Sequence, residues 1–151
     1  TAVLKVIQKD LLKVSKSNVE LKFKKKFDVE PKSLNLNITL RKYTKQNYPI
    51  CFDGFRSICP VTSQPDFAKI YILTSAKIET IWLRKLLTSF KESGEFHEQC
   101  IENIFSKLSK KYPNHDLEVC GRFLRRGGID INPIRSSKKS LFFKNFRAFN
   151  Q

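Results

Sequence analysis

Two helix-like segments in the middle of the chain constrain its fold more than any other feature. Residues 79–90 ("ETIWLRKLLTSF") and 95–111 ("EFHEQCIENIFSKLSKK") repeat apolar side chains at helical spacing, and "KESG" separates them. Gly94 marks the break. The second segment carries an apolar stripe made of Cys100, Ile101, Ile104, Phe105 and Leu108. The sequence therefore predicts two consecutive helices here.

Strand-like segments flank this pair of helices. "SLNLNITL" (33–40) alternates apolar and polar residues, and "KIYIL" (69–73) follows after a polar, aromatic loop. "DLEVCGRF" (116–123) alternates again, and "GIDINPI" (128–134) forms one more strand that Pro133 ends. Together these segments predict one β-β-α-α-β-β unit.

The beginning of the chain repeats part of this order. Residues 2–14 have the spacing of an amphipathic helix, and "VELKF" (19–23) alternates as a half-buried strand does. The helix, break and strand resemble those of residues 100–123, which suggests two related units. We therefore expect three parts: residues 1–32 as the last helix and strand of a truncated N-terminal unit, 33–137 as a complete unit, and 138–151 as a basic, aromatic tail.

The chain is strongly basic, with 29 Lys and Arg against 14 Asp and Glu and a net charge of +15. Such a charge invites a nucleic-acid partner. The lysines are scattered, however, so solvated surface is the simpler interpretation, with RNA or an anionic cofactor or substrate as alternatives. The sequence contains no apolar run long enough to span a membrane and no signal peptide.

Four cysteines form no CxxC pair and no zinc-binding spacing with His97 or His115, so no metal site is expected. So few cysteines in so apolar a chain favour reduced thiols and a cytoplasmic protein. Cys51, Cys100 and Cys120 have the surroundings of packed, inert side chains.

Cys59 differs, because prolines frame it together with an acid in "ICPVTSQPDFA". A cysteine nucleophile needs a partner for proton transfer, and Asp66 is the nearest candidate in sequence. Pro60 and Pro65 restrict the backbone of the intervening loop. The alternative is an inert cysteine in a turn, with Asp66 capping that turn or a helix.

Two further motifs have a chemical and a structural interpretation. "FHE" (96–98) places His97 and Glu98 about 100° apart on a helix, so that both can border a cleft for a flat heterocycle, with Phe96 as a stacking face. The alternative is an acid at a helix N-terminus beside a partly exposed histidine. "RRGG" (125–128) suits a phosphate-contacting turn or a tight hairpin connection.

In combination, "CPVTSQPDFA", "SFKESGEFHEQC" and "GRFLRRGGIDINPIRS" closely resemble the QueF family of NADPH-dependent 7-cyano-7-deazaguanine reductases, which act in queuosine biosynthesis. The resemblance covers roughly residues 55–137. It implies an α+β tunnelling fold (T-fold), an antiparallel sheet backed by two long helices, with active sites at interfaces between units. It also implies a homo-oligomer, a dimer of two-unit subunits, without direct RNA binding.

The resemblance further implies roles for single residues. Cys59 matches the nucleophile that forms a thioimide with the nitrile, and Asp66 matches its proton donor. His97 and Glu98 match the pair that holds the substrate, with His97 assisting proton transfer. Phe96 would border the nicotinamide, while Arg126 and Gly127 match positions that contact NADPH.

One family motif is not matched. The form Glu-Ser/Leu-Lys-Ser/Ala-x-Lys binds the cofactor, and the nearest window here, "ETIWLR" (79–84), has Ile81 at the first lysine. Two-unit members of the family carry this motif in the N-terminal unit, so poor turnover is expected of this chain alone. Two other functions stay open: a QueF-like amidinotransferase acting on the nitrile in tRNA, and a non-catalytic RNA-binding module.

Overall fold

The computed structural model of the chain describes residues 2–45, 47–149 and 151. In chain order its elements are α1 (Ala2–Ser15), β1 (Leu34–Asn35), β2 (Tyr43–Thr44), β3 (Ile50–Ile58), β4 (Pro65–Thr74), β5 (Ile78–Glu79), α2 (Thr80–Thr88), the 3-10 turn η1 (Ser89–Glu92), α3 (His97–Lys111), β6 (Leu117–Phe123) and β7 (Ile134–Ser136).

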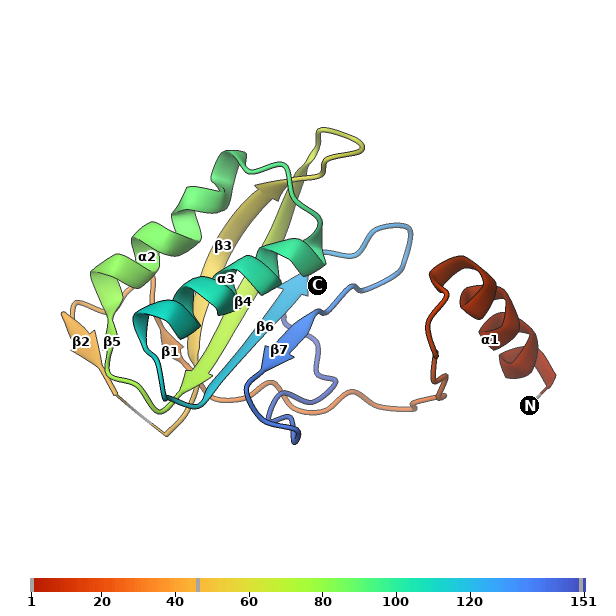
Figure 1. Cartoon of the computed structure of the whole chain (residues 1–151), viewed down its shortest axis with the longest axis horizontal. Coiled ribbons are helices and arrows are strands. Elements are labelled where there is room, and N and C mark those ends of the chain that lie inside the picture. Colours follow the sequence, from red (N-terminus) through yellow and green to blue (C-terminus); the bar gives the residue numbers. More distant parts are fainter. Residues whose placement is uncertain (1, 46, 150) are drawn as a thin grey trace.

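A five-stranded sheet forms the centre of the molecule, in the order β1-β3-β4-β6-β7. Its strands pair antiparallel, except that the two-residue β1 pairs parallel with β3. Helices α2 and α3 lie side by side across one face of this sheet (Figure 1). The α+β class and the antiparallel sheet backed by two helices are therefore confirmed.

The main core lies between the sheet and these two helices. Its central side chains are fully buried, among them Phe55 of β3, Ile70 of β4, Leu83 of α2, and Ile101 and Ile104 of α3. The predicted stripe on α3 faces this core, with Phe105 partly buried at its border. Both predicted helices of the central pair are thus confirmed, and Gly94 lies between them as expected.

The opposite face of the sheet is covered by the C-terminal tail, whose packing the sequence left open. Phe143 and Phe146 are 2% and 1% exposed and pack against Cys51, Tyr71 and Cys120. Because β6 is covered on both faces, all seven of its residues are buried, although its alternating sequence is typical of a half-buried strand.

Three strand predictions need correction. Residues 19–23 form no strand within the described residues, because no neighbouring strand pairs with them. The predicted strand 33–40 ends at Asn35, whose side chain accepts from the Asn37 N–H (2.8 Å) and turns the chain; Leu40 is 99% exposed.

The last predicted strand, 128–134, is also displaced. Pro133 has no N–H to donate to a ladder, and β7 begins only at Ile134.

Conversely, the nine-residue β3 falls largely in the predicted loop. The alternation of inward-facing and outward-facing residues along β3 is interrupted at Gly54, which has φ 74° and lies in a bulge between Phe52 and Phe55.

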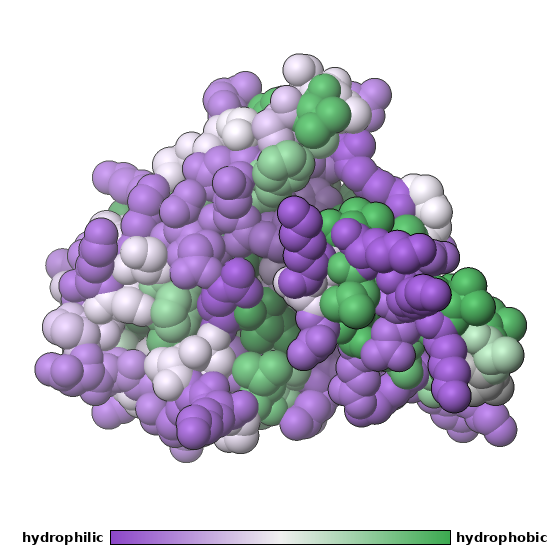
Figure 2. Space-filling model, turned by 45° about the vertical axis from the view of Figure 1, so that its right-hand side comes forward, coloured by the Kyte–Doolittle hydropathy of each residue, from purple (hydrophilic) through white to green (hydrophobic). Residues whose placement is uncertain are grey.

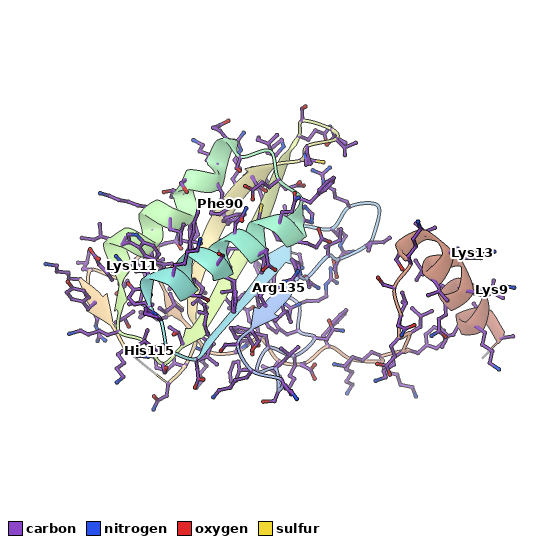
Figure 3. All side chains as sticks on the ribbon, viewed as in Figure 1. Lys9, Lys13, Phe90, Lys111, His115 and Arg135 are labelled. Carbon is purple, nitrogen blue, oxygen red and sulfur yellow. The ribbon has the colours of Figure 1, made fainter. Side chains whose placement is uncertain are left out.

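Helix α1 forms as predicted but projects away from the sheet, and none of its described residues is buried (Figure 1). Lys9 and Lys13 point outward from it (Figure 3). The surface is largely hydrophilic, with hydrophobic residues showing on the side where α1 lies (Figure 2). No helix in the described part of the chain has the length and apolar character needed to cross a bilayer.

Candidate functional site

The hairpin that joins β3 to β4 presents Cys59 at its tip. Ile58 pairs with Pro65, so residues 59–64 form the connecting loop. The Cys59 N–H donates to the Gln64 carbonyl (2.8 Å), and the Ser63 N–H donates to the Cys59 carbonyl (2.9 Å). These bonds fix the backbone of Cys59, while its side chain stays partly exposed.

The loop also stabilises a thiolate at Cys59. Hydrogen bonding from the Thr62 side chain and, to a smaller extent, from the backbone of Thr62 and Val61 lowers the pKa of Cys59 from its ordinary value of 9.0. Desolvation and the Asp66 carboxylate act in the opposite direction but with smaller effect. A thiol with a lowered pKa and solvent access is a reactive one.

Asp66 is a buried carboxylate held by two other elements. It is 5% exposed, in the second position of β4. Its Oδ1 accepts from Arg126 Nε at 2.7 Å and also contacts a second guanidinium nitrogen, while its Oδ2 lies 3.1 Å from His97 Nε2. The structure thus joins β4, α3 and the segment after β6 at one carboxylate.

His97, the first residue of α3, is 6% exposed and stacks on Phe123 at the end of β6. The two ring centroids lie 3.9 Å apart, with 9° between the ring planes. Since Phe123 is fully buried, this stack holds the imidazole plane while Nε2 faces Asp66.

Arg126 reaches Asp66 from a tight hairpin. Arg126 and Ile129 exchange backbone hydrogen bonds of 3.1 and 3.0 Å, and Gly127 and Gly128 between them have φ of 56° and 80°. Two positive φ values are typical of a type I′ turn, so "RRGG" forms a hairpin connection. A Cβ added at either glycine would have no atom within 4 Å, so the turn is open to solvent.

Phe96 and Glu98, on either side of His97, lie on the adjoining surface. Phe96 is 48% exposed, and its N–H donates to the Gln99 side chain (3.1 Å). Glu98 is exposed and makes no hydrogen bond or ion pair within residues 2–45, 47–149 and 151. The structure therefore joins Asp66, His97 and Arg126 by direct contacts. Cys59 lies in the loop that leads into β4, the strand of Asp66, and Phe96, Glu98 and Gly127 are exposed.

Sequence reasoning missed three members of this site: Thr62, Phe123 and Ser57. Ser57 lies directly across from Asp66 in the β3–β4 register, is fully buried, and its hydroxyl has no hydrogen-bond partner in the described part of the chain. Phe123 stands within a quoted motif, yet its contact with His97 depends on how α3 crosses the sheet. Only Thr62 could have been found, because it lies three residues from the thiol.

The remaining cysteines have no such environment. Burial raises the pKa of Cys100 to about 11 and that of Cys120 to about 12, and it also raises the pKa of Cys51. Within the described residues no three His, Cys, Asp or Glu side chains are placed to hold a metal ion. Glu79 of the unmatched motif precedes α2, at the other end of β4 from Cys59, where it pairs with Lys111 (3.4 Å).

A cavity of about 580 Å³ lies away from this site. Its lining includes Thr74 at the end of β4, Ser136 of β7 and Phe142 of the tail, and does not include Cys59. Asp66, His97 and Arg126 do not line this cavity either.

Comparison with known proteins agrees with these motifs. The sequence profile of one protein family, described as QueF-like protein, matches residues 65–141, just over half of the chain. The chain belongs to this family. The match includes Asp66, His97 and Arg126 but begins after Cys59.

Curated relatives in this family carry the name NADPH-dependent 7-cyano-7-deazaguanine reductase. The protein of Buchnera aphidicola (subsp. Schizaphis graminum) is 50% identical over 84 residues, covering 55% of this chain and 32% of the relative. That of Legionella pneumophila (strain Lens) is 45% identical over 101 residues, covering 66% and 35%. The chain thus spans about a third of the length of the curated relatives it matches.

A solved structure shares the fold. The crystal structure of the archaeosine synthase QueF-Like in the apo form superposes with a TM-score of 0.54 at 14% sequence identity, over 66% of this chain and 96% of that one. At this identity the likeness concerns the fold alone, and it confirms the predicted T-fold.

Proposed function

We propose that this chain supplies the nucleophile and the proton-transfer groups of an NADPH-dependent 7-cyano-7-deazaguanine reductase. The observation that carries the proposal is Cys59, whose pKa is lowered by its loop. This loop leads into β4, where Asp66 pairs with His97. The names of the curated relatives supply the substrate class and the cofactor.

The first step suits this geometry. The Cys59 thiolate adds to the nitrile carbon, so that one S–C bond forms and one C–N π bond breaks. The nitrogen then takes a proton from the Asp66–His97 pair, which gives a neutral thioimide. His97 Nε2 lies 3.1 Å from Asp66 Oδ2, so a proton can pass directly between the two groups.

The substrate ring would lie on the open surface beside His97. The exposed Glu98 carboxylate can accept from the N–H edge of a deazaguanine, and the half-exposed Phe96 offers a flat apolar face. Because this surface is not enclosed within one chain, we propose that another T-fold unit covers it in a homo-oligomer.

The residues around Gly127 fit the edge of a bound cofactor. The backbone of this turn is open, since no atom lies within 4 Å of an added Cβ, and Phe96 is accessible to a nicotinamide ring. Two molecules of NADPH, bound one after the other, would each supply one hydride, and together these hydrides would take the nitrile to the amine. Meanwhile the covalent bond to Cys59 keeps the carbon in place for the first transfer.

Mass spectrometry of the protein mixed with 7-cyano-7-deazaguanine tests this function. We expect a covalent adduct on Cys59 that added NADPH consumes, with oxidation of NADPH followed in parallel. Cys59→Ala should abolish the adduct, whereas Ser63→Ala, an exposed change in the same loop, should retain it. An adduct that persists in Cys59→Ala, or no adduct at all, would exclude the nucleophile. An adduct inert to NADPH would leave two explanations, the amidinotransferase or a reductase chain that lacks the unit carrying the cofactor motif.

A further inference from the structure

The ring of Phe123 defines the plane in which the His97 imidazole lies. The two rings are nearly parallel, with 9° between their planes and 3.9 Å between their centroids. Both side chains are buried, at 0% exposure for Phe123 and 6% for His97. Because the imidazole cannot tilt toward Phe123 without a clash, one face of His97 is fixed by this contact alone.

Phe123 is itself held from two sides. Its ring packs edge-on against Phe55 of β3, with centroids 6.0 Å apart and 88° between the ring planes. On the same face of β6, a Cβ added at Gly121 would lie 2.7 Å from Phe123 Cε2, so the ring occupies the space that this glycine leaves free. The flat surface under His97 therefore belongs to the packed core and not to a mobile side chain.

Asp66 sets the direction of the imidazole within that plane. Its Oδ1 accepts from Arg126 Nε at 2.7 Å, and its Oδ2 lies 3.1 Å from His97 Nε2. A carboxylate that pairs with a guanidinium only accepts hydrogen bonds, so the ring nitrogen that faces it carries a proton. The plane from Phe123 and the direction from Asp66 together place one N–H group of His97 at Nε2.

We propose that Phe123 is a positioning residue for proton transfer, because its ring holds the His97 imidazole in the plane in which Nε2 presents its proton to Asp66 Oδ2. This inference deepens the proposed function and rests on it for the destination of the proton, which is the nitrile nitrogen. In that transfer the Asp66–His97 pair gives up one proton, and water resupplies it. The orientation of the imidazole is independent of any substrate.

The first test detects the proton on His97 directly. The chain has two histidines, and His115 lies at the opposite end of β6 from Phe123, with its Nδ1 3.2 Å from Ser75 Oγ. Long-range 1H–15N spectra of protein labelled with 15N-histidine show which ring nitrogen is protonated at the alkaline end of a pH series. In the wild type, His97 should be protonated at Nε2. In Phe123→Leu its two 15N signals should converge as a second tautomer appears, while those of His115 stay in place.

The second test compares two reactions of the Cys59 thiol in the absence of NADPH. Alkylation by iodoacetamide needs the thiolate but no proton donor, whereas addition to a nitrile needs both. Phe123→Leu should therefore slow adduct formation with 7-cyano-7-deazaguanine by about tenfold, a part of what a positioned proton donor contributes. The rate of alkylation should stay unchanged. Peptide mass spectrometry measures both rates.

Phe90→Leu is the matched control. Phe90 is a ring of the same core, 3% exposed, and it packs against Phe55 with centroids 5.5 Å apart. Its loss should lower the melting temperature much as the loss of Phe123 does, but leave the His97 spectrum and the adduct rate unchanged. Phe123→Met is a second variant without a flat face, whose flexible side chain can fill the same space, and it should behave like Phe123→Leu.

Three results would overturn the proposal. They are unchanged His97 signals in Phe123→Leu and Phe123→Met, equal slowing of adduct formation and alkylation in these variants, and a Phe90→Leu variant with the same spectrum and rates as Phe123→Leu. If the wild type forms no adduct, the reductase function fails, and the spectra alone then decide whether Phe123 orients His97.

Discussion

At the scale of single residues, the reactivity of Cys59 depends on the loop that holds it. The Thr62 side chain is the largest influence that lowers the pKa of Cys59, followed by the backbone of Thr62 and of Val61. A backbone donor can be removed only by a proline, which also restricts the backbone, whereas a side-chain donor can be removed by itself. Thr62 is therefore the position at which thiolate stabilisation can be changed without touching Cys59 or Asp66.

Thr62→Val should raise the pKa of Cys59, because it removes this donor while keeping the shape of the side chain. In the wild type the lowered pKa keeps the thiolate populated to lower pH, and alkylation slows as the pH falls through that pKa. In Thr62→Val this decline should begin at higher pH. Thr62→Ser retains a hydroxyl and should behave like the wild type. Identical pH profiles for Val and Ser would contradict the role of the hydroxyl.

The sequence identifies the groups of this site better than it identifies their contacts. Cys59 and Asp66 stand close together in the chain, so their proximity could be predicted. The pairing of Asp66 with Arg126 joins residues 60 positions apart, and it depends on the register between β4 and β6 and on the turn at Gly127. The register between strands is set when the sheet assembles, so it cannot be predicted from the local spacing of apolar residues.

At the scale of elements, the crossing of α3 over β6 places His97. Gly121 in the middle of β6 permits this close approach, because a Cβ built there would lie 2.7 Å from Phe123 Cε2 and 2.9 Å from Ile101 Cδ1. Phe123 is the ring on which His97 stacks. A side chain at position 121 would therefore displace either α3 or the support of the imidazole.

Gly121→Ala should lower the free energy of unfolding by about 1–3 kcal/mol, the usual cost of overpacking a core, as measured by urea denaturation. Gly94→Ala is the matched control, since its added methyl would meet no atom within 4 Å. It should leave stability nearly unchanged. If both variants unfold at the same urea concentration, the close packing at Gly121 does not limit the distance between α3 and β6.

Helices were easier to predict than strands in this chain, for a physical reason. The apolar stripe of α3 depends on one face of one element, and its spacing survives in the sequence. The strand β3 carries a bulge at Gly54, and β7 begins only where Pro133 stops interfering with the ladder. In both strands a local backbone feature, rather than the pattern of apolar residues, determines where pairing starts and stops.

At the scale of the whole molecule, both faces of the sheet are covered, each by a different part of the chain. Helices α2 and α3 cover one face, and the tail covers the other with Phe143 and Phe146. Phe146 packs edge-on to Tyr71, with ring centroids 5.1 Å apart, and the Arg122 guanidinium lies 4.0 Å from its ring centroid. Arg122 is 2% exposed, so the tail encloses a charged side chain as well as apolar ones.

The tail should therefore contribute to the stability of the entire domain. Phe146→Ala removes a buried ring from the second core and should lower the free energy of unfolding by about 3–5 kcal/mol. It also exposes the cation that the ring covers. Phe149→Ala, three residues further along, removes the same ring from a fully exposed position and should change stability by less than about 0.5 kcal/mol. Thermal and urea unfolding of both variants measure this difference; equal effects would mean that the tail adheres to the sheet without stabilising it.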